Sequence, residues 1–304
     1  MLIVVALGDS ALVSGERSHG ATVEPRALKA AVQALVDVAA AHDVVLTHGN
    51  VPQLDVLESR EQAAASRLHP SGVDVLGAEA EGIIGYLLDQ ELANQLPDRH
   101  VAALLTQVVV DVDDPAFGAP VQRVGLQFSE DEARELAIGR RWAMARGNGD
   151  QFRRVLPSPE PRHIIELATI RLLVDAGTVV VCAGGGGIPV MLGPDGSLRG
   201  VEAVVDKDLA AALLAIELEA DMLLLLTDVP AVFADWPSAH ARPLRSATPT
   251  GLRAMTFLAD SMAPKVEAAC RFVEATGKTA AIGALCDAAA IVNGETGTLV
   301  RKGL

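Results

Sequence analysis

Two lysines stand at the starts of predicted helices, where a cation is normally disfavoured. Lys207 lies between Asp206 and Asp208, directly before a helical stretch. Lys265 follows Pro264, and proline is typical of a first helical turn. An aspartate there is an ordinary helix cap, but the helix dipole opposes a lysine. Both lysines are explained if they face a polyphosphate anion, so the pair favours a phosphoryl-transfer site in which Asp206 and Asp208 orient Lys207 or hold a metal ion.

A run of four glycines follows the apolar stretch that ends at Cys182. Gly184, Gly185, Gly186 and Gly187 have no Cβ, so their backbone can approach a ligand closely and offer N–H groups to a phosphate. A tight turn without room for side chains explains two glycines more easily than four. We therefore predict phosphate or substrate contact there, although the run matches neither the Walker pattern nor GxGxxG.

Polar residues also follow three other apolar runs. They are Gly8, Asp9 and Ser10 after the first run, His48, Gly49 and Asn50 after the second, and Thr227 and Asp228 after a later one. Ligands of open α/β sheets bind at the carboxyl ends of strands, so these residues are predicted to lie at a ligand site. His48 alone is more typical of a hydrogen-bonded structural imidazole than of a catalytic base.

The apolar runs themselves are short and continuous, as expected for strands buried on both faces of a parallel sheet. They span Leu2–Leu7, Val44–Thr47, Val101–Val110, Thr178–Cys182, Met222–Thr227 and Thr279–Ile282. Ala-rich helical stretches alternate with them at Pro25–Ala41, Leu76–Leu96, Pro161–Asp175, Asp208–Leu218 and Pro264–Thr276. This alternation predicts an α/β fold, a three-layer α/β/α sandwich with a central, mainly parallel sheet, as one domain over residues 1–304.

The segment Asp113–Pro161 departs from this alternation. It is rich in Pro, Gly, Arg and acidic residues, and it carries Phe117, Phe128, Trp142 and Phe152. Disordered linkers rarely hold so many aromatic residues. The segment is therefore predicted to form a small protruding subdomain inserted into the domain.

The overall charge argues against two classes of partner. Lys and Arg number 25 against 39 Asp and Glu, a formal net charge of −14, which disfavours nucleic acid and anionic membranes. No apolar run reaches the roughly 20 residues of a membrane helix, and the N-terminus lacks the basic region of a signal peptide. Cys182, Cys270 and Cys286 show no metal-ligand spacing. Buried thiols in a reducing compartment explain them better than a disulfide framework, so a cytoplasmic protein is expected. A small-molecule substrate is the expected partner.

These motifs, in this order, resemble the carbamate kinase branch of the amino-acid kinase family. Matching stretches are LTHGN at Leu46–Asn50, DVLGAEAEGIIGYLLDQEL at Asp74–Leu92, RRVLPSPEPRHI at Arg153–Ile164, CAGGGGIPV at Cys182–Val190 and GVEAVVDKDLAAALLA at Gly200–Ala215. Together with shorter matches towards both ends, they cover nearly the whole chain. The second and third stretches are specific to this branch, because they are not general features of amino-acid kinases.

The resemblance implies a homodimer that uses ATP or ADP with Mg2+, without a tightly bound metal held by the protein. It implies reversible transfer of a phosphoryl group from carbamoyl phosphate to ADP, giving ATP and carbamate. Lys207 would stabilise the transferring group, Asp208 would orient Lys207, and Lys265 would contact the nucleotide phosphates. Substrate and phosphate would be bound by Gly8, Asp9, Ser10, Gly49, Asn50 and Gly184–Gly187, and the nucleotide by Thr227, Asp228, Phe233 and Lys265.

Several positions depart from the family pattern. The family's GGNA is Gly8-Asp9-Ser10-Ala11 here, so Asp9 brings a carboxylate to a loop that should face a phosphoryl group. In the family's HGNGPQVG, Val51 replaces a glycine, and a β-branched residue does not readily adopt positive φ. The remaining departures are Asp55, Gln122 for a lysine with Arg123 beside it, Ala263 for a glycine within Ser261–Lys265, and Pro230 within Thr227–Phe233.

Three functional hypotheses follow. The first is a carbamate kinase that tolerates these departures. The second is a kinase of the same fold for another small acceptor, with Asp9 and Asp55 suited to an amine or guanidine. The third is a nucleotide-binding protein without catalysis that serves as a sensor or regulatory subunit. The presence of Lys207, Asp208 and Lys265 with the glycine run argues against the third. Gln122 in place of a lysine and Val51 in place of a glycine argue against an unmodified carbamate site, and the first hypothesis is preferred over the second.

Overall fold

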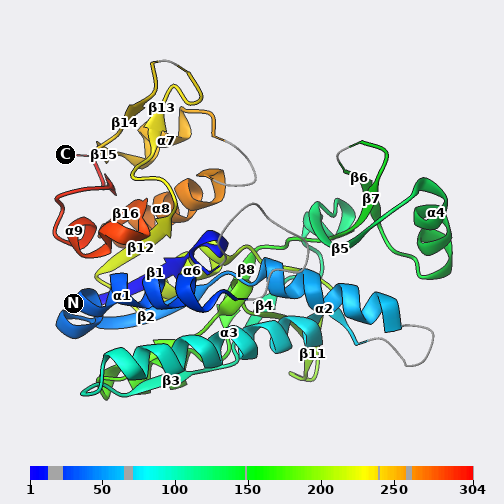
Figure 1. Cartoon of the computed structure of the whole chain (residues 1–304), viewed down its shortest axis with the longest axis horizontal. Coiled ribbons are helices and arrows are strands. Elements are labelled where there is room, and N and C mark those ends of the chain that lie inside the picture. The colour runs from blue at the N-terminus through cyan, green and yellow to red at the C-terminus, as the bar shows by residue number, and fades with distance from the viewer. Residues whose placement is uncertain (13–22, 65–70, 148, 239, 258–261, 304) are drawn as a thin grey trace.

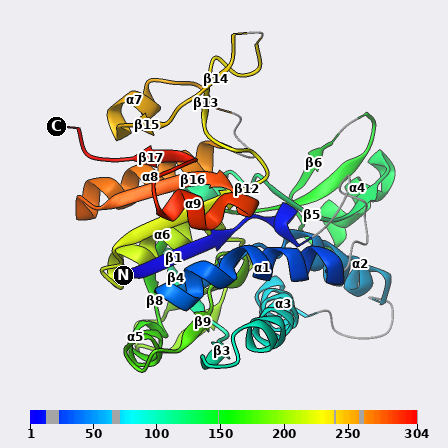
Figure 2. The ribbon, with the colours of Figure 1, turned by 60° about the vertical axis from the view of Figure 1, so that its left-hand side comes forward.

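One eight-stranded sheet forms the centre of the molecule (Figures 1 and 2). A computed structural model describes residues 1–12, 23–64, 71–147, 149–238, 240–257 and 262–303. In sheet order the strands are β15 (Ser246–Ala247), β17 (Thr298–Val300), β16 (Thr279–Ala284), β12 (Met222–Thr227), β1 (Leu2–Leu7), β2 (Asp43–His48), β9 (Val179–Val181) and β3 (Val101–Ala103). Neighbours pair in parallel except β16 with β17, so the predicted mainly parallel sheet is confirmed.

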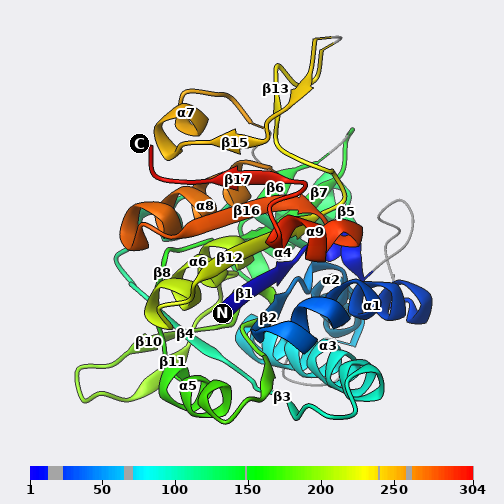
Figure 3. The same cartoon turned by 90° about the vertical axis from the view of Figure 1, so that its left-hand side faces the viewer.

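Helices cover both faces of this sheet, as Figure 3 shows. One face packs against α1 (Pro25–Ala41), α3 (Val73–Gln95) and α9 (Ala288–Val292), the other against α5 (Leu167–Asp175), α6 (Lys207–Glu217) and α8 (Met262–Thr276). Successive side chains of β1 alternate between the two cores: Ile3, Val5 and Leu7 enter the first, and Val4 and Ala6 the second. The three-layer sandwich is therefore confirmed. Among the described residues, no helix combines the length and apolar character needed to cross a bilayer.

The run Val101–Val110, predicted as one strand, is two strands in two sheets. After β3 the chain turns at Thr106, whose hydroxyl donates to Leu104 O and accepts from Ala183 N. It then continues as β4 (Gln107–Val110) in a four-stranded sheet with β11 (Leu198–Gly200), β10 (Ile188–Leu192) and β8 (Pro161–Ile164). Both halves are apolar, so hydrophobicity alone did not reveal the bend.

The predicted helix Pro161–Asp175 is wrong in its first part. Residues Pro161–Ile164 form β8, which pairs antiparallel with β4, for example Val108 with Ile164. Helix α5 begins only at Leu167. The strand is favoured here because β4 offers its backbone groups to β8, a tertiary contact that local sequence does not encode.

Residues within 113–161 build a separate three-stranded sheet. Its order is β5 (Gln122–Phe128), β7 (Phe152–Leu156) and β6 (Met144–Arg146), with α4 (Glu130–Gly139) beside it, and it projects to one side of the molecule in Figure 1. Helix α2 (Val51–Ala64), which the sequence analysis did not predict, packs against β5. We propose that residues 113–161 are one inserted subdomain within a single domain.

Candidate active site

The register of the central strands brings the predicted loops to one edge of the sheet. In β1, Leu7 lies opposite His48 of β2 and Leu226 of β12. The next residues continue this pairing: Gly8 N donates to Leu226 O at 3.2 Å, and Gly49 N donates to Leu7 O at 3.1 Å. The loops after β1, β2 and β12 therefore start side by side, as expected for a site at the carboxyl ends of parallel strands.

The two predicted lysines meet around one buried carboxylate. Lys265, in the first turn of α8, donates from Nζ to both oxygens of Asp208 at 2.9 and 3.1 Å. Nζ of Lys207 lies 3.9 Å from the same carboxylate. Asp208 was predicted to orient Lys207, but its short contacts are to Lys265. Asp206 is an ordinary helix N-cap, because its Oδ1 accepts from the N–H groups of Asp208 and Leu209.

Asp9 lies directly against this cluster. It opens the short 3-10 turn η1 (Asp9–Ala11), and its Oδ2 lies 3.2 Å from Nζ of Lys207. Its Oδ1 accepts from the N–H of Val51 at 3.2 Å. The carboxylate also packs on Gly49, where a Cβ would be 2.1 Å from Oδ1. Ser10, the next residue, is exposed.

Both members of the Asp9–Lys207 pair are charged at neutral pH. Burial opposes the charge of Asp9, but attraction to Lys207 and the hydrogen bonds from Lys207 and Val51 outweigh it, so the pKa of Asp9 lies below its ordinary value. Burial also opposes the charge of Lys207, but the surrounding carboxylates Asp9, Asp208 and Asp206 raise its pKa above its ordinary range. An unusual carboxylate thus neutralises the lysine assigned to the phosphoryl group.

Val51, which stands where the family has a glycine, does not cause the backbone strain that a positive φ would produce. Val51 is the first residue of the right-handed helix α2, so it does not need positive φ. Asp55, one turn further, accepts from Gly125 N at 2.9 Å and from Arg153 Nη2 at 2.8 Å. Its carboxylate therefore binds the proposed subdomain, which removes one of the two carboxylates suggested for a cationic acceptor.

The other departures lie in β5, in α8 and in the segment after β12. Gln122 is half-buried in β5, and Arg123 beside it is exposed. Ala263 is the second residue of α8, while Ser261 lies outside the described residues. Pro230 is exposed in the segment after β12.

The glycine run forms a tight turn between β9 and β10. Gly185, Gly186 and Gly187 have φ of 65°, 94° and 81°, a region that favours glycine. A Cβ on Gly185 would be 2.0 Å from Nδ2 of Asn50, and one on Gly186 would be 2.3 Å from the carbonyl oxygen of Val205. The turn therefore packs between Asn50 and the segment that leads into Asp206 and Lys207, which brings the predicted glycine and lysine sites together.

Glu81 of α3 supports this turn and was missed by the sequence analysis. Its Oε1 accepts from Gly184 N at 2.8 Å and its Oε2 from Thr106 N at 3.3 Å. Burial raises the pKa of Glu81 to about 8, although these hydrogen bonds oppose the shift. A signal was present, because Glu81 lies three and seven residues before the buried Ile84 and Leu88, on the apolar face of the helix.

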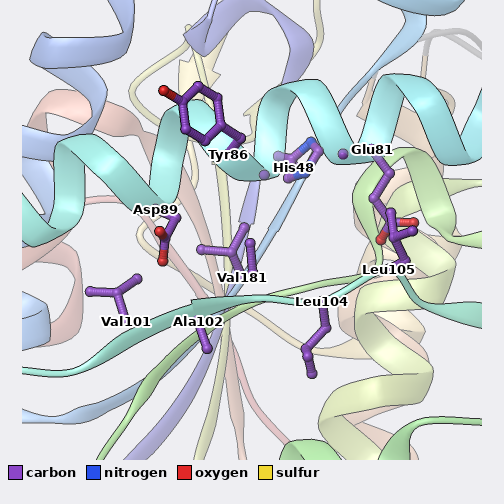
Figure 4. A pocket seen from close by; sticks show the side chains of 12 residues that line it. His48, Glu81, Tyr86, Asp89, Val101, Ala102, Leu104, Leu105 and Val181 are labelled. Atoms are coloured by element: carbon purple, nitrogen blue, oxygen red, sulfur yellow. The ribbon is translucent and has the colours of Figure 1, made fainter.

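His48 has the structural surroundings that were predicted for it. Its Nδ1 lies 3.0 Å from Gly49 O, and burial lowers its pKa to about 4, so the ring is neutral at pH 7. His48 and Glu81 both line a cavity of about 400 Å³ between α3 and β3, shown in Figure 4. Lys207 and Lys265 are not among its lining residues, so this cavity is separate from the lysine cluster.

Apart from Lys265, the predicted nucleotide residues lie at the end of β12 and in the segment after it. Thr227 donates from its hydroxyl to Asp228 Oδ1 at 3.1 Å, next to the start of the Gly8 loop. Phe233 lies in β13 (Phe233–Ala234), paired with β14 (Arg242–Pro243), and its ring centroid is 5.7 Å from that of Trp236. The nucleotide role of Phe233 stays a prediction. Within the described part of the chain, no group of three or more His, Cys, Asp or Glu side chains is arranged to hold a metal ion.

Comparisons with known proteins agree with this arrangement. Residues 1–283 match the model of the amino acid kinase family. The chain is 46% identical over 304 residues to a carbamate kinase of Rhizobium meliloti, covering 99% of this chain and 93% of that protein. It is 39% identical over 309 residues to a carbamate kinase of Pyrococcus furiosus, covering 98% of each. The solved carbamate kinase of Giardia lamblia bound to AMP-PNP superposes with a TM-score of 0.94 at 34% identity, covering 99% and 98% of the two chains.

Proposed function

The chain belongs to the amino acid kinase family, and from that premise we propose that it is a carbamate kinase, which transfers a phosphoryl group reversibly between carbamoyl phosphate with ADP and carbamate with ATP. One observation carries this proposal beyond family membership. Lys207 and Lys265 converge on Asp208 beside the glycine turn, at the edge of the sheet where ligands bind. Asp55 binds Gly125 and Arg153, so it does not support a cationic acceptor.

The reaction requires charge stabilisation more than covalent help from the protein. A β-phosphate oxygen of ADP attacks the phosphorus of carbamoyl phosphate, the P–O bond to the carbamoyl oxygen breaks, and carbamate leaves with that electron pair. Lys207 would balance the negative charge on the transferring group. In the glycine turn, the N–H groups of Gly184, Gly186 and Gly187 already donate within the chain, so the N–H of Gly185 would be the one to orient a phosphoryl oxygen. Lys265 is held by Asp208 at the start of α8, from where it would contact the nucleotide phosphates.

Several buried polar atoms in the loop after β2 and the start of α2 have no hydrogen-bond partner. They include Nε2 of His48, Oδ1 of Asn50, an acceptor, and Nε2 of Gln53, a donor. An unsatisfied buried polar group costs about 1–3 kcal/mol, so a ligand that pairs with it is favoured. A carbamoyl group offers both an N–H donor and a carbonyl acceptor, which supports Asn50 and Gln53 as its binding residues.

We propose ATP or ADP with Mg2+ as the nucleotide substrate. The carboxylates around the lysines are already engaged: Asp9 pairs with Lys207 and accepts from Val51 N. Asp206 caps α6, and Asp208 accepts from Lys265. These residues do not form a ligand set of the kind that holds a resident metal ion. Magnesium often depends on substrate phosphates for several of its ligands, so it would enter with the nucleotide.

A homodimer through the outer face of α3 is also proposed. Val75, Ile83 and Tyr86 lie along this face, exposed by 53%, 41% and 60%, and Leu105 beyond β3 is exposed by 53%. Apolar side chains gathered on one face are typical of an interface. Gly85 of the same helix instead packs on Ala103 of the chain's own sheet. Cys182 and Cys270 are buried free thiols, as predicted, whereas Cys286 is exposed because it lies in the short 3-10 turn after β16. Free thiols support a cytoplasmic location.

Light scattering after size exclusion tests the homodimer. We expect a dimer for the unchanged protein and a monomer for Tyr86→Asp. Leu172→Asp places the same charge on the exposed face of α5 and should leave the dimer intact. A monomeric unchanged protein would refute this part of the proposal.

The proposed activity is tested by ATP formation from carbamoyl phosphate and MgADP with a luminescent readout. We expect robust ATP formation that Lys207→Ala reduces by about 10²- to 10³-fold or more. Lys29→Ala removes the same charge from an exposed site on α1 and should keep full activity. Absence of ATP formation by the unchanged protein, while MgADP still raises its melting temperature, would show that the acceptor is a different molecule.

A further inference from the structure

The carboxylate of Asp9 has the surroundings that an anionic substrate would have. It lies 3.2 Å from the ammonium group of Lys207 and accepts the first N–H of α2, from Val51, at 3.2 Å. It also packs directly on the backbone of Gly49, closer than any Cβ would allow. Proteins commonly bind phosphate with the same three features: a lysine, a helix N-terminus and a glycine whose backbone the anion can approach closely.

In this chain the Asp9 carboxylate already occupies Lys207 and the first N–H of α2. Side chains of the pair retain 24% exposure for Asp9 and 20% for Lys207, so they lie at the mouth of the site rather than inside the core. Two anions at one ammonium group repel each other, so a phosphoryl group and the Asp9 carboxylate cannot share Lys207 without cost. Because the Asp9 side chain is partly exposed, a rotation about its Cα–Cβ bond can carry it to solvent.

We propose that Asp9 is an internal competitor of the phosphoryl group: its carboxylate occupies the anion position at Lys207 and the start of α2, and the substrate must displace it. The inference rests on the proposed function, because it takes Lys207 as the residue that binds the phosphoryl group. Asp9 thereby determines how tightly the site holds its anionic substrate, and it weakens that binding.

The competition has a chemical consequence for both directions of the reaction. A site with a free lysine would hold carbamoyl phosphate tightly before the reaction, and this uniform binding would not raise the rate of the chemical step. The cost of displacing Asp9 lowers the affinity of the site for carbamoyl phosphate. Carbamoyl phosphate therefore dissociates more readily when the reaction forms it. Asp9 also holds the Lys207 ammonium group, at 3.2 Å, when the site contains no substrate.

Calorimetric titration with phosphonoacetamide measures this competition directly. The probe carries a phosphonate and a carboxamide joined through carbon, so no phosphoryl group can be transferred. We expect Asp9→Asn to bind it roughly 10- to 100-fold more tightly than the unchanged protein, the range of one charge-assisted contact. Asp98→Asn changes the net charge equally at an exposed site after α3 and should leave the affinity unchanged.

A double-mutant cycle shows whether Asp9 acts through Lys207. In a Lys207→Met background, Asp9→Asn should give less than a threefold gain, because the competed cation is gone. An equal gain in both backgrounds, or affinity that is unchanged or weaker in Asp9→Asn, would overturn the proposal. Weaker binding that depends on Mg2+ would also overturn it, because Asp9 would then be a metal ligand.

The outcomes separate this inference from the proposed function. If the unchanged protein forms ATP from carbamoyl phosphate and Asp9→Asn has the same KM for carbamoyl phosphate, the competitor role is refuted and the activity stands. If neither protein forms ATP nor binds phosphonoacetamide, while MgADP still stabilises both, the proposed substrate and the competitor role are refuted together.

Discussion

Lys265 and Asp208 form a two-point ion pair between two helices. Nζ of Lys265 donates to both carboxylate oxygens at 2.9 and 3.1 Å, and the residues are only 5% and 2% exposed. The pair joins the first turn of α8 to the first turn of α6. It therefore places the two lysines relative to each other, so that the same contact contributes to stability and to the geometry of the site.

Removing Lys265 should destabilise the whole fold. Lys265→Met leaves the buried Asp208 carboxylate without its short partner, and such a loss costs about 3–5 kcal/mol. Lys278→Met is the matched control, because the exposed pair of Lys278 with Asp221 at 3.3 Å is expected to contribute about 0–1 kcal/mol. Urea denaturation measures both. Equal losses would show that the buried pair has no special role in stability.

The free energy of unfolding should depend on pH through Glu81. The pKa of Glu81 rises from 4.5 to about 8 in the folded protein. Between these values the folded state holds a proton that the unfolded chain has released, which lowers the free energy of unfolding as pH rises, by at most about 1.4 kcal/mol per pH unit. Below about pH 6.5 the lowered pKa of His48 has the opposite effect, so the fall is expected between pH 6.5 and pH 8. Glu81→Gln should flatten the dependence in that range. Glu79→Gln, exposed on the same helix, should not, and a flat profile of the unchanged protein would refute the assignment.

Gly186→Ala should reduce activity more than its backbone strain alone explains. Gly186 and Gly196 have φ of 94° and 78°, so alanine is strained at both by about 1 kcal/mol. A Cβ on Gly186 would meet the carbonyl oxygen of Val205 at 2.3 Å, whereas a Cβ on Gly196 has open space. Val205 directly precedes Asp206 and Lys207. We expect ATP formation to fall by about tenfold or more in Gly186→Ala only; equal effects of both variants would contradict the contact.

Arg154 should hold the proposed subdomain to the rest of the domain. The buried Arg154 of β7 binds Glu58 of α2 at 2.6 Å and Glu202, in the segment before α6, at 2.8 Å. Arg154→Met leaves the buried Glu58 unpaired, with an expected loss of about 3–5 kcal/mol and faster hydrogen exchange in β5 and β7. Arg134→Met, in an exposed cluster on α4, is the control. Unchanged exchange in β5 and β7 would show that other contacts hold the subdomain.

Much of the fold could be predicted from continuous apolar runs with clear boundaries. β1, β12 and α1 have the bounds that were predicted, because Gly8, Asp228 and Pro25 mark where each begins or ends. Helix α2 was missed for a physical reason. Its buried apolar side chains include Leu54 and Leu57, but much of its surface is polar and pairs with arginines of β7, about a hundred positions later in the chain.

The candidate site was predictable in its residue types but not in its pairings. The positions of Lys207 and Lys265 against their helix dipoles pointed to an anion site, and the structure brings both to Asp208. That Asp208 contacts Lys265 closely, while Asp9 is the close partner of Lys207, depends on the packing of α6, α8 and the loop after β1. Helix dipoles and spacing along the chain do not specify such distances.

Helix α2 gives the molecule a mechanical link. Its 14 residues form a rod of about 21 Å, with its first N–H on Asp9 and its side chains Asp55 and Glu58 on the proposed subdomain. A tilt of about 10° about the first turn would move the last turn by roughly 4 Å. Release of Asp9 from Val51 by an incoming substrate would therefore change a contact on the same short rod that binds the proposed subdomain through Asp55 and Glu58.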